Sequence, residues 1–177
     1  MMKKIVIPLL LLASPLLFAA SETAQLDTGL VNPGYHDKPA WFKDSFLDIS
    51  EDIEEATDAD KRVLLYFYQD GCPYCAKLLH DNFGNRDISN KTEENFDVIA
   101  INMWGDREVS GLNGEVTTEK AFSQSLKVQF TPTLLFLDEN GKVLVRLNGY
   151  LHPHQFDVVL DYVAQKKEGE MSVRDYV

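Results

Sequence analysis

The only two cysteines of the 177-residue chain lie three positions apart, in Cys72-Pro73-Tyr74-Cys75. A pair with this spacing can form a structural disulfide, supply two ligands to a metal site, or exchange electrons with other disulfides. A structural bridge would close almost no loop, so it would restrain the unfolded chain little. A small secreted protein that needed such bridges would be expected to carry several cysteines separated by longer loops. A structural role is therefore disfavoured.

A metal site would need more ligands than the pair supplies. Structural zinc is held by four nitrogen or sulfur donors, and the remaining candidates are His36, His80, His152 and His154. His80 is five residues beyond Cys75 on one predicted helix, about 140° around its axis, so it should point away. The last two histidines flank a proline at another predicted helix start, where solvated side chains are expected. We expect no metal and no cofactor. An iron–sulfur cluster bridged between two chains is a weaker form of this alternative.

Electron exchange is the chemistry that the surrounding residues favour. If Cys72 is the N-cap of a helix, Pro73 takes the first helical position, where its missing N–H costs nothing. The sulfur would then face the amides of Tyr74 and Cys75 at the positive end of the helix dipole, which favours the reactive thiolate. Cys75 could then resolve a mixed disulfide made by Cys72. The hypothesis needs a reachable sulfur, and Gly71 would let another backbone approach it.

The elements that must position this pair follow from the hydrophobic pattern. Apolar runs predict strands in RVLLYFYQ, in FDVIAINM and on both sides of Asn140-Gly141, a dipeptide suited to a tight hairpin. Helical spacing predicts one helix through Phe42, Phe46, Ile49 and Ile53, one that begins at the cysteines, one over 117–127 and one over 152–164. The order predicts a three-layer α/β/α sandwich whose mixed sheet has parallel strands and a C-terminal antiparallel hairpin.

The ends of the chain differ from this central part. Residues 1–20 combine Lys3 and Lys4 with a proline-interrupted apolar run, which is typical of a secretory signal peptide rather than of a retained membrane anchor. Residues 21–39 have no periodicity and are predicted to be an exposed lead-in. The folded domain is expected over 40–166, followed by a loosely held tail over 167–177.

The charge of the chain excludes some partners. It carries 28 acidic and 17 basic residues, a formal net charge of −11, and removal of the signal peptide would take two lysines with it. Nucleic acid and anionic lipid would both be repelled. We therefore expect no nucleic-acid partner and no membrane contact once the signal peptide is cleaved.

With these elements in place, the chain resembles thioredoxin-fold proteins over residues 40–164. The resemblance rests on the Cys72–Cys75 motif, on Thr131-Pro132 at the position of the family's cis-proline, and on Gly149 after the final strand. More narrowly, the stretches 68–72, 102–106 and 130–133 are similar to SoxW-type periplasmic thioredoxins linked to sulfur oxidation. The resemblance implies that Cys72 is the nucleophile and Cys75 the resolving thiol of a redox-active disulfide. It also implies that the backbone of Thr131 pairs with the substrate chain.

Three positions depart from the usual thioredoxin pattern. Gly71 stands where tryptophan usually precedes the first cysteine, Tyr66 where a buried aspartate usually accepts a proton, and Ala100 where a lysine usually partners that aspartate. The proton of Cys75 must then leave by water or another base. The Pro73-Tyr74 pair matches glutaredoxins, so a glutathione partner stays open.

The resemblance implies an exported, periplasmic protein-disulfide reductase. We expect substrate contacts at Gly71, Tyr74, Thr131 and Pro132, disulfide-containing client proteins, and a membrane thiol-electron transporter as the reductant. Residues 105–118 are too short for the helical insertion of a DsbA-like oxidase, and 21–39 cannot form the dimerisation domain of a DsbC-like isomerase. The open alternatives are glutaredoxin-like or oxidising exchange, a metal-delivery module that uses the same thiols, and a non-catalytic interaction domain.

Overall fold

The computed structural model describes residues 37–177, so the predicted signal peptide and most of the predicted lead-in lie outside the described residues. The elements are α1 (Ile49–Asp58), β1 (Arg62–Tyr68), α2 (Pro73–Asp81), α3 (Arg86–Asn95), β2 (Phe96–Asn102), β3 (Glu108–Ser110), β4 (Val116–Thr118), α4 (Glu119–Ser125), β5 (Thr133–Leu137), β6 (Val143–Asn148), α5 (Pro153–Ala164), η1 (Lys167–Gly169) and α6 (Val173–Tyr176). Within residues 37–177, no helix has both the length and the apolar character needed to cross a bilayer.

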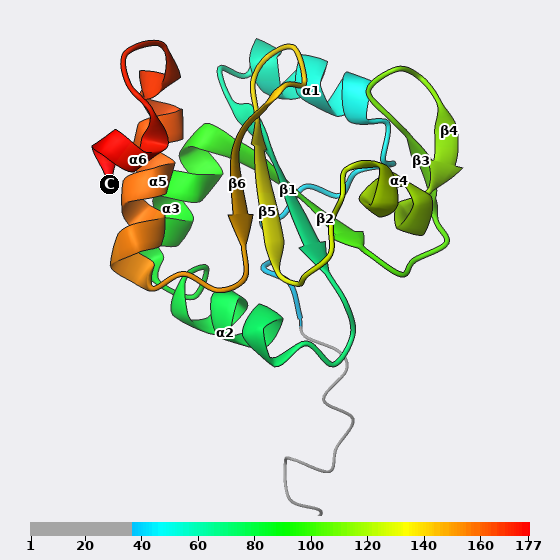
Figure 1. The fold of residues 1–177 in the computed structure, drawn as a ribbon, viewed down its shortest axis with the longest axis horizontal. Helices are drawn as coiled ribbons and strands as arrows, with labels where there is room; N and C mark the ends of the chain where they lie inside the picture. The colour runs from blue at the N-terminus through cyan, green and yellow to red at the C-terminus, as the bar shows by residue number, and fades with distance from the viewer. Residues whose placement is uncertain (1–36) are drawn as a thin grey trace, which may run out of the picture.

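A four-stranded sheet forms the centre of the molecule, in the order β2-β1-β5-β6 (Figure 1). Strands β1 and β2 are parallel, and β5 is antiparallel to both β1 and β6. After Arg62, strand β1 is apolar and aromatic because both of its faces are covered. Leu64 and Tyr66 belong to one core, with α2, α3 and α5, whereas Val63 and Leu65 belong to the other, with α1 and α4. The predicted three-layer sandwich with a mixed sheet is confirmed.

The first helix is shorter than its hydrophobic spacing predicts. It begins at Ile49, and the side chain of Asp48 caps it by accepting the amide of Glu51. Leu47 has a left-handed backbone (φ 65°), which interrupts any helix that would continue from residue 42. Phe42 packs edge-on against Phe83 in the first core.

Two helices, not one, connect the cysteines to the next strand. Helix α2 ends at Asp81. The chain then turns so tightly that a Cβ added at Gly84 would lie 2.2 Å from the carbonyl oxygen of His80, so only glycine fits there. Asn85 then caps α3 by accepting the amides of Asp87 and Ile88. The hydrophobic pattern does not indicate this break, because α3 is strongly polar and buries only Ile88 and Thr92.

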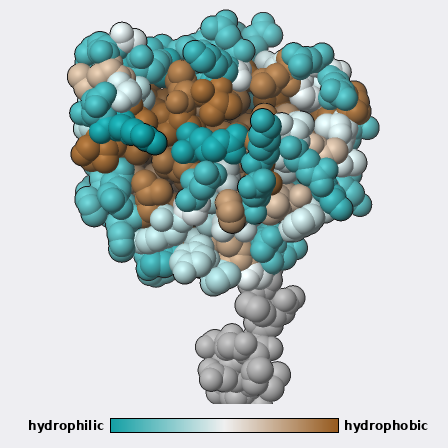
Figure 2. Space-filling model, in the orientation of Figure 1, coloured by the Kyte–Doolittle hydropathy of each residue, from teal (hydrophilic) through white to brown (hydrophobic). Residues whose placement is uncertain are grey.

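Two hairpins also differ from expectation. The polar stretch after β2 contains the small antiparallel pair β3–β4, which lies apart from the central sheet. The β5–β6 connection is not a two-residue turn, because Gly141 has positive φ but Asn140 does not. Instead, the carboxylate of Asp138 accepts the amides of Asn140 and Lys142, giving a three-residue loop. In Figure 2, a hydrophobic area surrounded by hydrophilic residues lies near this connection.

The C-terminal tail is packed against the domain rather than loosely held. Tyr162 of α5 donates a hydrogen bond to the carbonyl oxygen of Met171 and stacks edge-on with Tyr176. Arg62, at the start of β1, binds Glu168 at 2.6 Å, Glu139 at 3.1 Å and the carbonyl oxygen of Val163 at 2.8 Å. This arginine is only 6% exposed, so it ties the tail to the central sheet.

Candidate active site

The cysteine pair lies at the N-terminus of α2, at the end of β1. Cys72 is the N-cap, with extended backbone angles (φ −81°, ψ 106°), and Pro73 takes the first helical position, as the sequence predicts. The two cysteines form a disulfide. The amide of Cys75 donates to the sulfur of Cys72 across 3.0 Å. The same amide would stabilise a thiolate on Cys72 once the disulfide is reduced.

Thr131 faces the disulfide from the opposite loop. Its hydroxyl donates to Sγ of Cys72 across 3.3 Å, and its carbonyl oxygen lies 3.5 Å from the same sulfur. The Thr131–Pro132 peptide bond is cis. The carbonyl oxygen of Pro132 accepts the amide of Gly149 at 2.7 Å, which ties this loop to the end of β6. The structure thus brings Cys72, Cys75 and Thr131 together.

The disulfide is more enclosed than the sequence-based hypothesis expects. Cys72 is 3% exposed and Cys75 is 1% exposed, because each sulfur is covered by its disulfide partner and Thr131 packs against Cys72. The surrounding residues are open: Gly71 is exposed and has no atom within 4 Å of the Cβ that it lacks. We therefore expect an incoming sulfur to approach Cys72 from the side of Gly71.

Three exposed aromatic residues lie at the same edge of the sheet as the disulfide. Tyr74 at the start of α2, Trp104 after β2 and Phe130 before β5 are 60%, 58% and 62% exposed. The end of β2 adjoins the end of β1 because the two strands are parallel, and β5 begins there because it is antiparallel to β1. The sequence pattern did not identify Phe130 as a site residue, although it directly precedes the Thr-Pro pair.

Polar contacts fix Trp104 next to the cysteine loop. Its indole N–H donates to the side chain of Gln69 at 2.8 Å, and its amide donates to Asn102 at 3.0 Å. The ammonium of Lys120 lies 5.4 Å from the centre of the indole ring. Gln69 is three residues before Cys72, so the indole is hydrogen-bonded to the loop that carries the disulfide.

Tyr66 occupies the side of the first core that contains the cysteines. It is 1% exposed, stacks on Tyr68 with 5.7 Å between ring centres, and pairs across the β1–β2 register with Ala100. Burial raises the pKa of the Tyr66 phenol, so it stays protonated at physiological pH. A neutral phenol and an alanine therefore stand opposite each other at the two positions where thioredoxins usually carry an aspartate and a lysine.

The described histidines do not gather around the cysteines. His80 is exposed and contacts Asp81, and His152 stacks with His154 at the start of α5. Among residues 37–177, no group of three or more histidine, cysteine or acidic side chains is placed to hold a metal ion.

Replacing Thr131 by valine tests the contact with Cys72. Valine keeps the shape but removes the hydroxyl, so the thiolate of reduced Cys72 would lose one charge-assisted hydrogen bond. We expect reduced Cys72 to be alkylated by iodoacetamide about tenfold more slowly at neutral pH, with the thiolate titration moved to higher pH. Thr131→Ser, which keeps the hydroxyl, is the control. Equal rates in the valine variant and the wild type would exclude this role.

The fold and the site together define a class. A mixed sheet between two layers of helices, with a Cys-x-x-Cys disulfide at a helix N-terminus facing a cis-proline loop, is a thioredoxin fold. The chain belongs to the family described as "Thioredoxin-like domain", whose model matches residues 49–164. The fold and the cysteine pair indicate thiol–disulfide oxidoreductase activity.

Solved structures agree with this assignment. A thioredoxin-fold protein from Helicobacter pylori is similar with a TM-score of 0.57 and 26% identity, over 66% of this chain and 82% of that chain. A thioredoxin from Thermus thermophilus is similar in fold with a TM-score of 0.52 and 22% identity, over 69% of this chain and 87% of that chain. A search of curated proteins gave no match.

Proposed function

We propose that the protein is an exported thiol–disulfide oxidoreductase that reduces disulfides in periplasmic client proteins. The observation that carries the disulfide-exchange part of the proposal is the environment of Cys72, whose sulfur accepts hydrogen bonds from the Cys75 amide and the Thr131 hydroxyl. Both donors would stabilise the thiolate, which is the species that attacks disulfides. The narrower similarity to SoxW-type periplasmic thioredoxins belongs to the same proposal.

The reaction proceeds in two exchange steps. The thiolate of reduced Cys72 attacks one sulfur of a client disulfide, which forms a mixed disulfide and releases the other client sulfur as a thiolate. The deprotonated thiol of Cys75 then attacks Sγ of Cys72, re-forms the Cys72–Cys75 disulfide and releases the second client thiolate. Two electrons pass to the client, whose two thiolates take up protons. A dithiol reductant must then return two electrons to the pair, and we propose a membrane thiol-electron transporter for this step.

Four residues are proposed to hold the client chain. The backbone of Thr131, whose carbonyl oxygen lies 3.5 Å from Sγ of Cys72, would pair with an extended client segment beside Pro132. Gly71 leaves room for that segment, and Tyr74 would lie beside it. The aromatic side chains around the disulfide support a protein client over glutathione, a small peptide with charged ends.

The direction of electron flow is tested by a redox equilibrium. The protein is equilibrated in mixtures of reduced and oxidised dithiothreitol while Trp104 fluorescence is followed. Trp104→Phe, which leaves Trp41, is the control. We expect a potential near that of thioredoxin, about −270 mV, rather than near that of DsbA, about −120 mV. A value close to the second would reverse the proposed direction. Faster reduction by glutathione than reaction with insulin would support the glutaredoxin-like alternative.

A further inference from the structure

Two exposed apolar side chains lie on the side of the molecule that contains the second core. Phe46 is 99% exposed, and Val116 is 61% exposed. They are linked by pairing: Asp48 bridges to Ser110 of β3, which pairs with Val116 of β4. We name Phe46, Val116 and the segment 46–48 with β3 and β4 the ribbon surface. Leu47 and Val109 below it belong to the second core, whereas the cysteines belong to the first.

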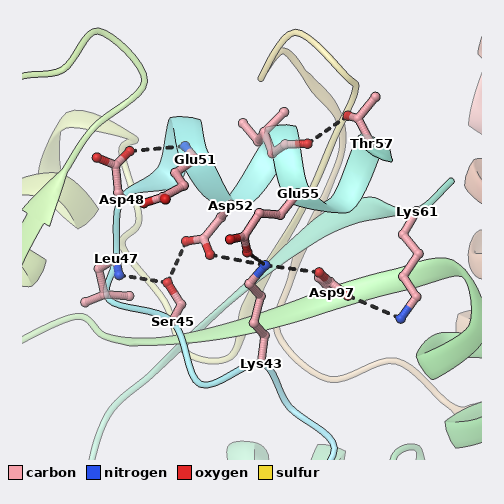
Figure 3. A network of polar contacts seen from close by, with 11 residues as sticks. Lys43, Ser45, Leu47, Asp48, Glu51, Asp52, Glu55, Thr57, Lys61 and Asp97 are labelled. Atoms are coloured by element: carbon pink, nitrogen blue, oxygen red, sulfur yellow. Dashed lines mark hydrogen bonds and ion pairs between the residues drawn. The ribbon is translucent and has the colours of Figure 1, made fainter. Parts of the chain in front are cut away.

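The loop that carries Phe46 holds its ring in solvent. Ser45 accepts the amide of Leu47 at 2.7 Å and donates to the buried carboxylate of Asp52 at 2.5 Å (Figure 3). The carbonyl oxygen of Leu47 accepts the amide of Ser110 at 2.9 Å. These bonds keep Leu47 in its left-handed conformation, with its side chain buried and the neighbouring ring outside. Asp48 caps α1, but capping does not explain an unburied phenylalanine.

The charges beside Phe46 decide which partner fits. A hollow of about 230 Å³ next to the ring is lined by Phe46 together with Asp44, Asp48, Glu51, Asp52 and Glu55. The one cation in its lining, Lys43, is already bound to Glu55 at 2.6 Å, Asp97 at 3.2 Å and Asp52 at 3.5 Å (Figure 3). Glu108 and Glu115 are exposed on β3 and before β4. An aromatic ring beside an excess of carboxylates complements a cation attached to an apolar surface.

We infer that the ribbon surface docks a basic segment of a partner protein, in which arginine or lysine side chains flank an apolar residue. The arginine or lysine would lie against the Phe46 ring and the carboxylates of the hollow, and the apolar residue would cover Val116. Because the two sites lie on opposite faces of the sheet, such a partner would leave the disulfide free to react with a client. The inference does not depend on the proposed reductase activity.

The probe for this surface is a fluorescein-labelled peptide of alternating arginine and leucine, with a matched peptide in which glutamate replaces arginine. Fluorescence anisotropy at low salt should show binding of the basic peptide and none of the acidic one. Phe46→Ser should weaken binding about fivefold, and Glu51→Gln about twofold. Phe130→Ser, which removes an equally large exposed ring on the cysteine side, should leave binding unchanged.

Because the Phe46 side chain is 99% exposed, its replacement is expected to leave folding and insulin reduction at wild-type levels. Equal binding by wild type and Phe46→Ser would overturn the inference, as would an equal loss in Phe130→Ser. Failure of the wild type and all variants to reduce insulin, with binding of the basic peptide to the wild type intact, would contradict the proposed function. The inferred docking surface would be unaffected by that result.

Discussion

Replacement of Cys72 by serine is expected to lower insulin disulfide reduction by roughly a thousandfold or more, as loss of a covalent nucleophile does in other enzymes. A serine hydroxyl cannot attack a disulfide at neutral pH, and the amide of Cys75 and the hydroxyl of Thr131 would then stabilise no thiolate. The measurement is the turbidity of reduced insulin with dithiothreitol as the electron source. A Cys72→Ser variant that keeps its activity would support the non-catalytic alternative.

The matched variant Cys75→Ser separates the two cysteine roles. It keeps the proposed nucleophile and removes the resolving thiol, so client proteins should accumulate as mixed disulfides through Cys72. Mass spectrometry of the trapped adducts identifies the sulfur involved. Adducts that form only when Cys75 is present and Cys72 is absent would reverse the assignment. Retention of a metal in proportion to the thiols after purification would favour the metal-delivery alternative.

Replacement of Arg62 by alanine is expected to lower the free energy of unfolding by about 3–5 kcal/mol. The arginine is 6% exposed, and its loss would leave Glu168, Glu139 and the carbonyl oxygen of Val163 without their shared donor. Chemical denaturation measures the loss. The control is Lys166→Ala, which removes a half-exposed cation 3.0 Å from the same Glu139 and should cost less than about 1 kcal/mol. Equal effects of the two substitutions would contradict the assigned role of Arg62.

The same ion pair should leave a signature in the pH dependence of stability. The hydrogen bond from Arg62 lowers the pKa of Glu139 from 4.5 to about 2. Since the folded value lies below the unfolded one, the contribution is complete above pH 4.5 and is lost as the pH falls toward 2. The free energy of unfolding should therefore decline over this interval in the wild type, and less steeply in Arg62→Ala.

The elements with strong hydrophobic patterns could be predicted, and those held by particular contacts could not. The apolar run of β1 and the stripe of α5 identify buried elements from residue type alone. Phe46 has helical spacing but is excluded from α1 by the left-handed Leu47, which no periodicity indicates. Helix α3 and the tail depend on capping by Asn85 and on the long-range contacts of Arg62.

The candidate site shows the same division. The positions of Cys72 and Pro73 at the helix start follow from local rules, and the structure confirms them. The side chains that complete the site come from distant segments. The hydroxyl of Thr131 reaches Cys72 because β5 runs antiparallel to β1, and Gln69 binds Trp104 because β2 ends beside β1. Such contacts depend on strand order, which a single sequence does not specify.

Tyr66 has a consequence for the lifetime of covalent complexes. Its phenol is neutral and buried, so it cannot draw a proton from Cys75, which is itself 1% exposed. The second exchange step would then wait for water to enter after the first has opened the site. We therefore expect the mixed disulfides between the wild-type protein and its clients to persist. Acid quenching followed by non-reducing gels should then capture natural substrates without any engineered cysteine.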